Sequence, residues 1–360
     1  MSLDLTDRVR PALVGFEPYD PAFTPCEVNL SANENTHELP PVVREAINAA
    51  LVSTPLNRYP DPLANDLRDV LAARHGVERG SVMVGNGGDE ILFNLFFAFG
   101  GAGRSLVTCP PDFSEYANFA TMCEMPVKCV WRDGDTFAID ADALVEATKD
   151  AAMAVVTSPN NPTGDLVDHA LIRRLLDETN ALVLVDEAYV EFAPEGSSVV
   201  SWVADNPRLM VLRTLSKAFA LAGLRCGYLV ADPSIIDELS AIRQIYSVDV
   251  LAQATAIAAV NEREALRPVV DDIKAERERL SLLLGNIPGL RQWPSEANFI
   301  LVRVPDASRV RQLLRDEFSI LVRDFSYAPG LTDCLRITVG TRQENDRLAE
   351  ALTELMKGEA

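Results

Sequence analysis

The residue best suited to covalent chemistry in this sequence is Lys217, which follows an expected strand at 210–213 and precedes a second apolar stretch. A lysine in apolar surroundings loses affinity for its proton and becomes a nucleophile that can form a Schiff base. Most lysines are solvated surface charges, so the neighbouring residues decide between the two interpretations. Thr214 and Ser216 precede this lysine, and Arg225 follows eight residues later. This combination makes Lys217 a candidate nucleophile.

A second candidate is Asp186, which ends the apolar run 182–185 and is followed by Glu-Ala-Tyr, the tyrosine being Tyr189. A carboxylate at the end of a buried strand is costly to remove from water unless it meets a cation, such as a protonated pyridine nitrogen or a metal ion. The alternative is an exposed aspartate that caps the next helix.

Two turns of unusual composition also follow apolar runs. Residues 85–88 read Gly-Asn-Gly-Gly and open a helical pattern, and glycine amides at a helix N-terminus can bind a phosphate. Residues 158–164 read Ser-Pro-Asn-Asn-Pro-Thr-Gly and follow the run 152–157, at the carboxyl end of a strand, where α/β proteins bind ligands. Either turn alone could be an ordinary tight turn, and the first is not the G-x-G-x-x-G pattern.

These motifs need a scaffold, and the apolar pattern predicts one. Short apolar runs alternate with amphipathic stretches from about residue 81 to 230, which is typical of a sheet with helices on its faces. Most of the runs are unbroken, as expected for strands that are covered on both faces. The sequence therefore predicts an α/β fold with strands at 82–84, 106–108, 127–130, 152–157, 181–185, 210–213 and 227–230.

The pattern changes after residue 248, where longer charged helices begin. The sequence predicts a large domain over 31–248 and a smaller α+β domain over 249–360. Residues 1–30, with four prolines, are expected to form an extended arm. In the smaller domain we expect helices at 252–261, 268–284 and 308–317 and strands at 298–303 and 335–339.

Composition and charge exclude several classes of function. The net charge of −20, from 33 Lys+Arg and 53 Asp+Glu, would repel nucleic acid and anionic membranes. The six cysteines are scattered and the three histidines offer few ligand sets, so no metal site is expected. No apolar run is long enough to span a membrane, and residues 1–10 carry charges where a signal peptide would be apolar. We therefore expect a cytoplasmic protein.

The motifs together carry a resemblance that none carries alone. The glycine-rich turn, the Asn-Pro-Thr-Gly turn, Asp186 with Tyr189, and Ser-Lys followed by Arg225 come in this order, each at the end of an expected strand. In this respect the chain resembles the fold-type I aminotransferases, and most closely the histidinol-phosphate aminotransferase family, from about residue 19 to 336. The resemblance implies pyridoxal 5'-phosphate as cofactor and transfer of an amino group in two half-reactions with ping-pong kinetics.

The resemblance also assigns roles to individual residues. Lys217 would hold the cofactor covalently and move a proton between substrate and cofactor. Asp186 would pair with the pyridine nitrogen, and Tyr189 and Asn161 with the ring oxygen, while Phe113 would stack on the ring. The cofactor's phosphate would be bound at Gly87, Gly88, Thr214, Ser216 and Arg225.

Further matches concern the partner subunit and the substrate. Tyr59 matches a tyrosine that reaches the phosphate of the neighbouring subunit, which implies a homodimer. Arg336 matches the arginine that binds the anionic end of the substrate. The residues matched to substrate binding are Tyr19, Asn33, Arg323 and Arg336. We expect histidinol phosphate as amino donor and 2-oxoglutarate as acceptor.

The sequence departs from the family in the loop that begins at Asn33. The family usually has Asn-Glu-Asn-Pro with a glycine soon after, whereas here Thr36-His37-Glu38 follows the second asparagine. This loop lies near the substrate in relatives, so the departure bears on the identity of the substrate more than on that of the cofactor.

Other interpretations remain at this point. An aromatic amino-acid aminotransferase or a decarboxylase of a phosphorylated amino acid would share almost all of these residues. A non-catalytic, aminotransferase-like effector domain of a transcription regulator would need a basic DNA-binding segment, and none is visible in residues 1–30. A Rossmann-type dehydrogenase would need a third glycine and a ribose-binding acid.

Overall fold

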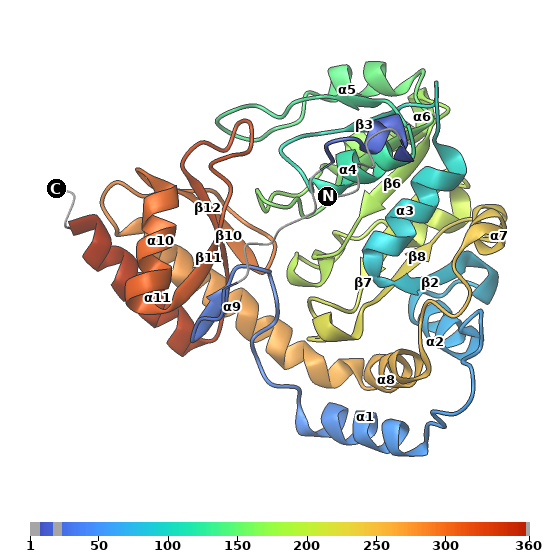
Figure 1. Ribbon diagram of the computed structural model, residues 1–360, viewed down its shortest axis with the longest axis horizontal. Coiled ribbons are helices and arrows are strands. Elements are labelled where there is room, and N and C mark those ends of the chain that lie inside the picture. The colour runs from blue at the N-terminus through green and yellow to red at the C-terminus, as the bar shows by residue number, and fades with distance from the viewer. Residues whose placement is uncertain (1–7, 17–23, 358–360) are drawn as a thin grey trace.

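The computed structural model describes residues 8–16 and 24–357. Two sheets organise them, and Figure 1 shows the larger sheet at the right and the smaller one at the left. The larger sheet has seven strands in the order β2-β8-β7-β6-β5-β3-β4, and β8 alone runs antiparallel to its neighbours. The predicted α/β fold with a mostly parallel seven-stranded sheet is thereby confirmed. Its strands are β2 (Val82–Asn86), β3 (Leu106–Thr108), β4 (Val127–Cys129), β5 (Met153–Thr157), β6 (Leu182–Asp186), β7 (Leu209–Thr214) and β8 (Cys226–Val230).

Helices cover both faces of this sheet because its strands are apolar on both sides. In β6, for example, Val183 and Val185 belong to one buried cluster and Leu184 to the other. One face packs against α3 (Gly87–Phe99), α4 (Glu115–Met122) and α7 (Pro233–Ile242). The opposite face packs against α2 (Asn65–His75), α5 (Ala141–Thr148), α6 (His169–Glu178) and α8 (Val250–Asn261), and α1 (Pro41–Ser53) lies on α8.

The smaller sheet has five strands in the order β1-β11-β12-β10-β9. The strands are β1 (Val28–Leu30), β9 (Arg291–Gln292), β10 (Phe299–Arg303), β11 (Ile320–Asp324) and β12 (Cys334–Thr338). Helices α9 (Arg267–Gly285) and α10 (Ala307–Phe318) pack against these strands, and α11 (Arg342–Lys357) packs against both helices. The expected strands at 298–303 and 335–339 are present, whereas the apolar pattern does not predict β1, β9 or β11. The segment before α1 thus contributes an edge strand, parallel to β11, to a sheet built otherwise from the end of the chain.

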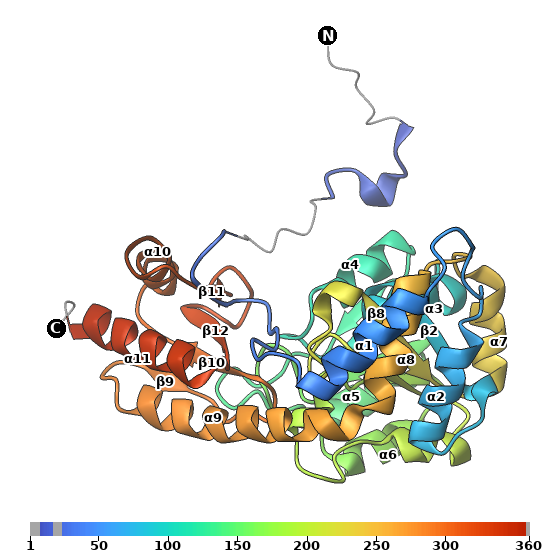
Figure 2. The same cartoon turned by 90° about the horizontal axis from the view of Figure 1, so that it is seen from below.

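Helix α9 joins the two parts. It contacts the short helix η4 (Val190–Phe192) beside the larger sheet as well as β9 and β10, and Figure 2 shows it running beneath the smaller part as far as the edge of the larger one. In the described residues, no helix combines the length and apolarity needed to cross a membrane. The division into an arm, a large domain and a small domain at residues 30 and 248 stays a proposal. The other short 3-10 helices of the described residues are η2 (Pro11–Leu13), η3 (Arg79–Ser81), η5 (Val200–Asp205), η6 (Ala222–Leu224) and η7 (Arg263–Leu266).

Candidate active site

A cavity of about 590 Å³ lies at the carboxyl ends of β5, β6 and β7, where the smaller sheet meets the larger one. Thr157, Asp186 and Thr214 end these three strands, and all three line the cavity. Arg323 of β11 and Arg336 of β12 line it from the smaller sheet. The edge of the larger sheet therefore contributes most of the predicted residues, and the second sheet closes the site.

Lys217 lies in the loop after β7, and its side chain points into this cavity. The amine donates a hydrogen bond to the backbone carbonyl of Ala32 at 2.9 Å and lies 5.7 Å from the centre of the Tyr189 ring. Burial, followed by the charge of Arg336, lowers the pKa of this lysine from 10.5 to about 8. With this pKa roughly a tenth of the amine is neutral at pH 7, and the neutral amine is the form that acts as a nucleophile or a base.

Asp186 is buried, with an exposed fraction of 6%, so it is not an exposed helix cap. It accepts hydrogen bonds from the Tyr116 hydroxyl at 2.6 Å and from the backbone N–H of Ala188 at 3.0 Å. Burial raises the pKa of this carboxyl from 3.8 to about 6. Among residues 24–357, no lysine or arginine forms an ion pair with it at salt-bridge distance. A positive charge on a bound molecule would stabilise its ionised form.

Tyr189 and Asn161 belong to one network with the loop after β1. The side-chain amide of Asn33 donates to the Tyr189 hydroxyl at 3.0 Å, and Arg336 donates to the side-chain oxygen of Asn161 at 2.6 Å. A second guanidinium nitrogen of Arg336 donates to the carbonyl of Ser31 at 2.7 Å. These contacts bring three distant parts of the chain to one wall of the cavity.

The predicted phosphate-binding residues gather at the start of α3. Gly88, Thr214, Ser216 and Arg225 line the cavity. The amide of Gly87 is already engaged, because it donates to the carbonyl of Arg225 at 3.0 Å. Gly87 has a φ of +77°, and a Cβ at this position would lie 2.6 Å from a guanidinium nitrogen of Arg225. The positive φ is what favours glycine at this position, since the tip of the arginine side chain could move aside, and Gly88 is the member of the pair that faces the cavity.

Phe113 lines the cavity and meets the Tyr116 ring edge-on, with ring centres 5.5 Å apart. Tyr116 also hydrogen bonds to Thr157 at 2.8 Å, and burial raises its pKa well above the ordinary value. The sequence motifs do not assign a role to Tyr116. Tyr116 lies on α4, three residues after Phe113, and this proximity to a predicted cofactor-binding residue could have indicated a role. Its partner Asp186, however, is 70 residues away in the chain.

Two predicted residues lie elsewhere. Tyr59 is 81% exposed, stacks on Tyr246 with ring centres 4.7 Å apart, and is not among the described residues that line the cavity of its own chain. Tyr19 lies outside the described residues.

The cavity is also lined by three residues that the sequence analysis did not predict, Glu34, Phe325 and Tyr327. In the described ranges, no group of three or more histidine, cysteine, aspartate or glutamate side chains could hold a metal ion.

Comparison with known proteins agrees with this geometry. The family model of the class I and II aminotransferases matches residues 26–352. The histidinol-phosphate aminotransferase of Thermoanaerobacter sp. (strain X514) is 38% identical over 355 residues, which cover 98% of this chain and 99% of that protein. The enzyme of the same name from Chlorobaculum tepidum is 37% identical over 350 residues, which cover 96% of this chain and 100% of that protein.

A solved structure extends the likeness to three dimensions. The crystal structure of histidinol-phosphate aminotransferase from Sinorhizobium meliloti in complex with pyridoxal-5'-phosphate superposes with a TM-score of 0.87 and 28% identity, covering 98% of each chain. The chain therefore belongs to the class I and II aminotransferases, and within them to the histidinol-phosphate aminotransferase family.

Proposed function

We propose that this protein is a pyridoxal-phosphate-dependent aminotransferase that transfers the amino group of histidinol phosphate to 2-oxoglutarate, in histidine biosynthesis. One observation carries the proposal. A single cavity joins a partly buried lysine of lowered pKa, a buried carboxylate without an ion-pair partner among the described residues, and two arginines on neighbouring strands. The relatives that share the family at 37–38% identity bear this name.

The residues present fit the cofactor. Asp186 lacks a cation, which a protonated ring nitrogen would supply, and Phe113 offers an aromatic face beside it. At the start of α3, Gly88 and the Thr214 and Ser216 hydroxyls can bind a phosphate, and the N-terminus of the helix favours its negative charge. Arg225 also lines this corner, where it forms an ion pair with Asp89 at 2.8 Å. Pyridoxal phosphate, when bound there, supplies an electron sink for the substrate's α-carbon.

The protein's own groups then have separate tasks. Lys217, held at the Ala32 carbonyl, is the base that takes a proton from the α-carbon of the donor and returns it during transfer. Asp186 keeps a negative charge at the ring nitrogen, and the Tyr116 hydroxyl fixes the orientation of this carboxylate. Arg336 is held by Asn161 and Ser31, so its guanidinium is oriented before an anionic substrate arrives.

The choice of substrate depends on Arg323. It is the register partner of Arg336 across β11 and β12, and both line the cavity. A dianionic phosphate that leaves water needs more than one cation, whereas a single carboxylate needs only one. The pair therefore favours a phosphorylated amino donor over an aromatic amino acid.

Replacing Arg323 with methionine tests this choice. The variant keeps an unbranched, flexible side chain but loses the guanidinium charge, so kcat/KM for histidinol phosphate should fall at least about tenfold, equivalent to about 1.4 kcal/mol. Activity with phenylalanine, if measurable, should fall less. The measurement is steady-state kinetics with both donors and 2-oxoglutarate. A wild-type preference for phenylalanine or tyrosine, or an equal loss with both donors, would refute the substrate while leaving the aminotransferase intact.

We further propose a homodimer in which Tyr59 serves the partner's site. Its 81% exposure in one chain supports this, as do the neighbouring exposed apolar residues Val52, Leu56 and Ile245. A cytoplasmic location stays a prediction from the sequence.

Mixing two inactive variants tests the shared site. Tyr59→Ala and Lys217→Ala chains, unfolded together and refolded, should regain activity, because a hybrid dimer carries one intact site. Statistical mixing gives half hybrids with one working site of two, so about a quarter of the wild-type activity is expected. Each variant refolded alone is the control. An active monomer in analytical ultracentrifugation would rule the proposal out.

A further inference from the structure

The segment from Ser31 to His37 contacts the catalytic groups at its first residues. The carbonyl of Ala32 accepts from Lys217 at 2.9 Å, and Asn33 donates to the Tyr189 hydroxyl at 3.0 Å. The backbone N–H of Asn33 donates to the Thr338 hydroxyl at 3.0 Å. A small displacement of this segment would therefore move the acceptor of Lys217 and the partner of Tyr189 together.

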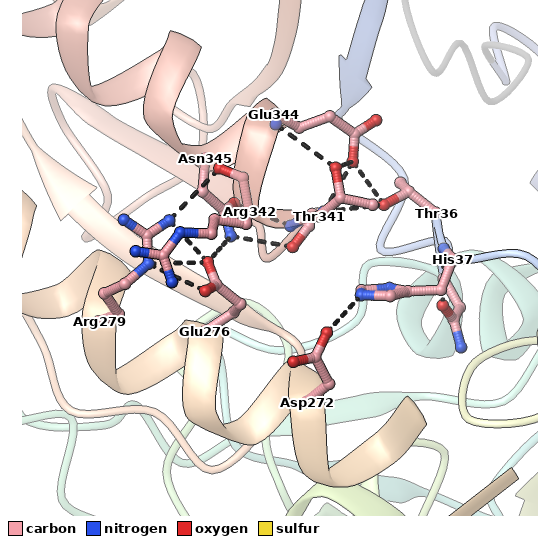
Figure 3. Close-up of polar contacts among 11 residues, drawn as sticks. Thr36, His37, Asp272, Glu276, Arg279, Thr341, Arg342, Glu344 and Asn345 are labelled. Carbon is pink, nitrogen blue, oxygen red and sulfur yellow. Dashed lines mark hydrogen bonds and ion pairs between the residues drawn. The ribbon is translucent and has the colours of Figure 1, made fainter. Parts of the chain in front are cut away.

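The far end of the same segment is held by the start of α11 (Figure 3). The Thr36 hydroxyl donates to a carboxylate oxygen of Glu344 at 2.6 Å. The same oxygen accepts from the backbone N–H of Thr341 at 2.7 Å and from the Thr341 hydroxyl at 2.9 Å. Thr341 and Glu344 form a capping box for α11, and Thr36 is an additional member from outside the helix.

Contacts between α9 and α11 fix the two helices that Thr36 and His37 contact. His37 lies 3.0 Å from the carboxylate of Asp272 on α9. Glu276 of α9 accepts from the Asn345 side chain of α11 at 3.0 Å, and Arg279 of α9 forms an ion pair with an α11 residue, Asp346, at 2.6 Å. Figure 3 shows Thr36 and His37 pointing toward this pair of helices.

We propose that Thr36 is a positioning residue whose hydroxyl, held in the capping box of α11, fixes Ala32 and Asn33 relative to Lys217 and Tyr189. Threonine does not restrict its own backbone as a proline ring would, so the contact of its hydroxyl with the Glu344 carboxylate is what holds this end of the segment. Hydrogen bonds to a charged group are stronger than neutral ones, which suits this role.

Three variants test the proposal. Thr36→Val keeps the branched shape without the hydroxyl, and Thr36→Ser restores the hydroxyl. The matched control is Thr353→Val, because Thr353 lies on α11 and its hydroxyl donates to the carbonyl of Ala349 at 2.7 Å, away from residues 31–37. The first readout is amide hydrogen exchange of residues 31–36 in the cofactor-free protein, which does not depend on the proposed substrate. The second is kcat and KM with histidinol phosphate, which does.

In Thr36→Val, exchange at residues 31–36 should speed up about fivefold or more, and kcat should fall roughly tenfold while KM for the donor changes less. Thr36→Ser should recover most of both, and Thr353→Val should change neither by more than about twofold. Unchanged exchange in Thr36→Val, a serine variant as impaired as valine, or an equal effect of the Thr353 control would overturn the proposal. If wild-type protein does not use histidinol phosphate, the proposed function fails and the exchange comparison still decides the role of Thr36.

Discussion

Replacing Lys217 with alanine should abolish covalent attachment of pyridoxal phosphate and lower turnover at least about a thousandfold. Its amine is the one whose pKa burial lowers to about 8, and it points into the cavity beside Tyr189. Positioned proton transfer alone contributes about 10²- to 10⁴-fold to rates, and the covalent link is lost as well. The measurement is mass spectrometry of borohydride-reduced, cofactor-loaded protein, together with the transamination rate.

Lys274→Ala is the matched control. Lys274 is also partly buried, and its amine donates to the carbonyl of Ala193 at 3.0 Å, but it does not line the cavity that holds Lys217. This variant should keep both the reducible link and the activity. A reduced cofactor that maps to any lysine other than Lys217 would contradict the assignment.

The strand-end residues were predictable because parallel strands place their carboxyl ends at one edge of a sheet. Asp186 and Thr214 each end a strand whose unbroken apolar run is legible in the sequence, and Lys217 follows the second of them closely. Local pattern is enough to bring such residues together once the strands are known to be parallel.

The contribution of the smaller sheet could not be derived from local pattern. The acceptor of Lys217 is the carbonyl of Ala32, 185 residues away, and backbone carbonyls carry no sequence signal. The register that sets Arg323 opposite Arg336 depends on strand β11, in which the apolar run is only three residues long before the charged pair. Arg323 and Arg336 were predicted to bind substrate from the resemblance to the aminotransferase family, and not from the periodicity of apolar residues.

Tyr116 shows a third kind of limit. Its position in the sequence is that of an ordinary residue on the buried side of α4, and its side chain is almost fully buried. Its hydroxyl bonds to Asp186 only because α4 packs on the face of the sheet from which that carboxylate emerges. Such a contact follows from tertiary packing, which no short motif encodes.

The carboxylate of Asp186 is expected to cost the cofactor-free protein stability at neutral pH. Its pKa is 3.8 ordinarily and about 6 in the fold because of burial. Between these values the native state holds a proton that the unfolded chain has released, so the free energy of unfolding falls as the pH rises through this window. The difference between the two pKa values corresponds to on the order of 3 kcal/mol.

Asp186→Asn should therefore stabilise the cofactor-free protein above pH 6 and yet cripple the loaded enzyme. Asparagine can accept the bond from Ala188 on its Oδ1 and donate from its Nδ2 to the Tyr116 hydroxyl, which then donates to Thr157. The fold should therefore persist, but the neutral amide cannot balance a protonated ring nitrogen. Losing one partner of a buried ion pair costs about 3–5 kcal/mol, so turnover should fall by about two to four orders of magnitude.

The measurements are thermal melts of cofactor-free wild type and variant at pH 5 and pH 8, and transamination rates. The melting temperatures should differ more at pH 8, because at pH 5 most of the wild-type carboxyl is already neutral. Near-normal turnover in the variant would show that the hydrogen bond to Ala188 is the whole role of Asp186, and that its charge serves no bound cation.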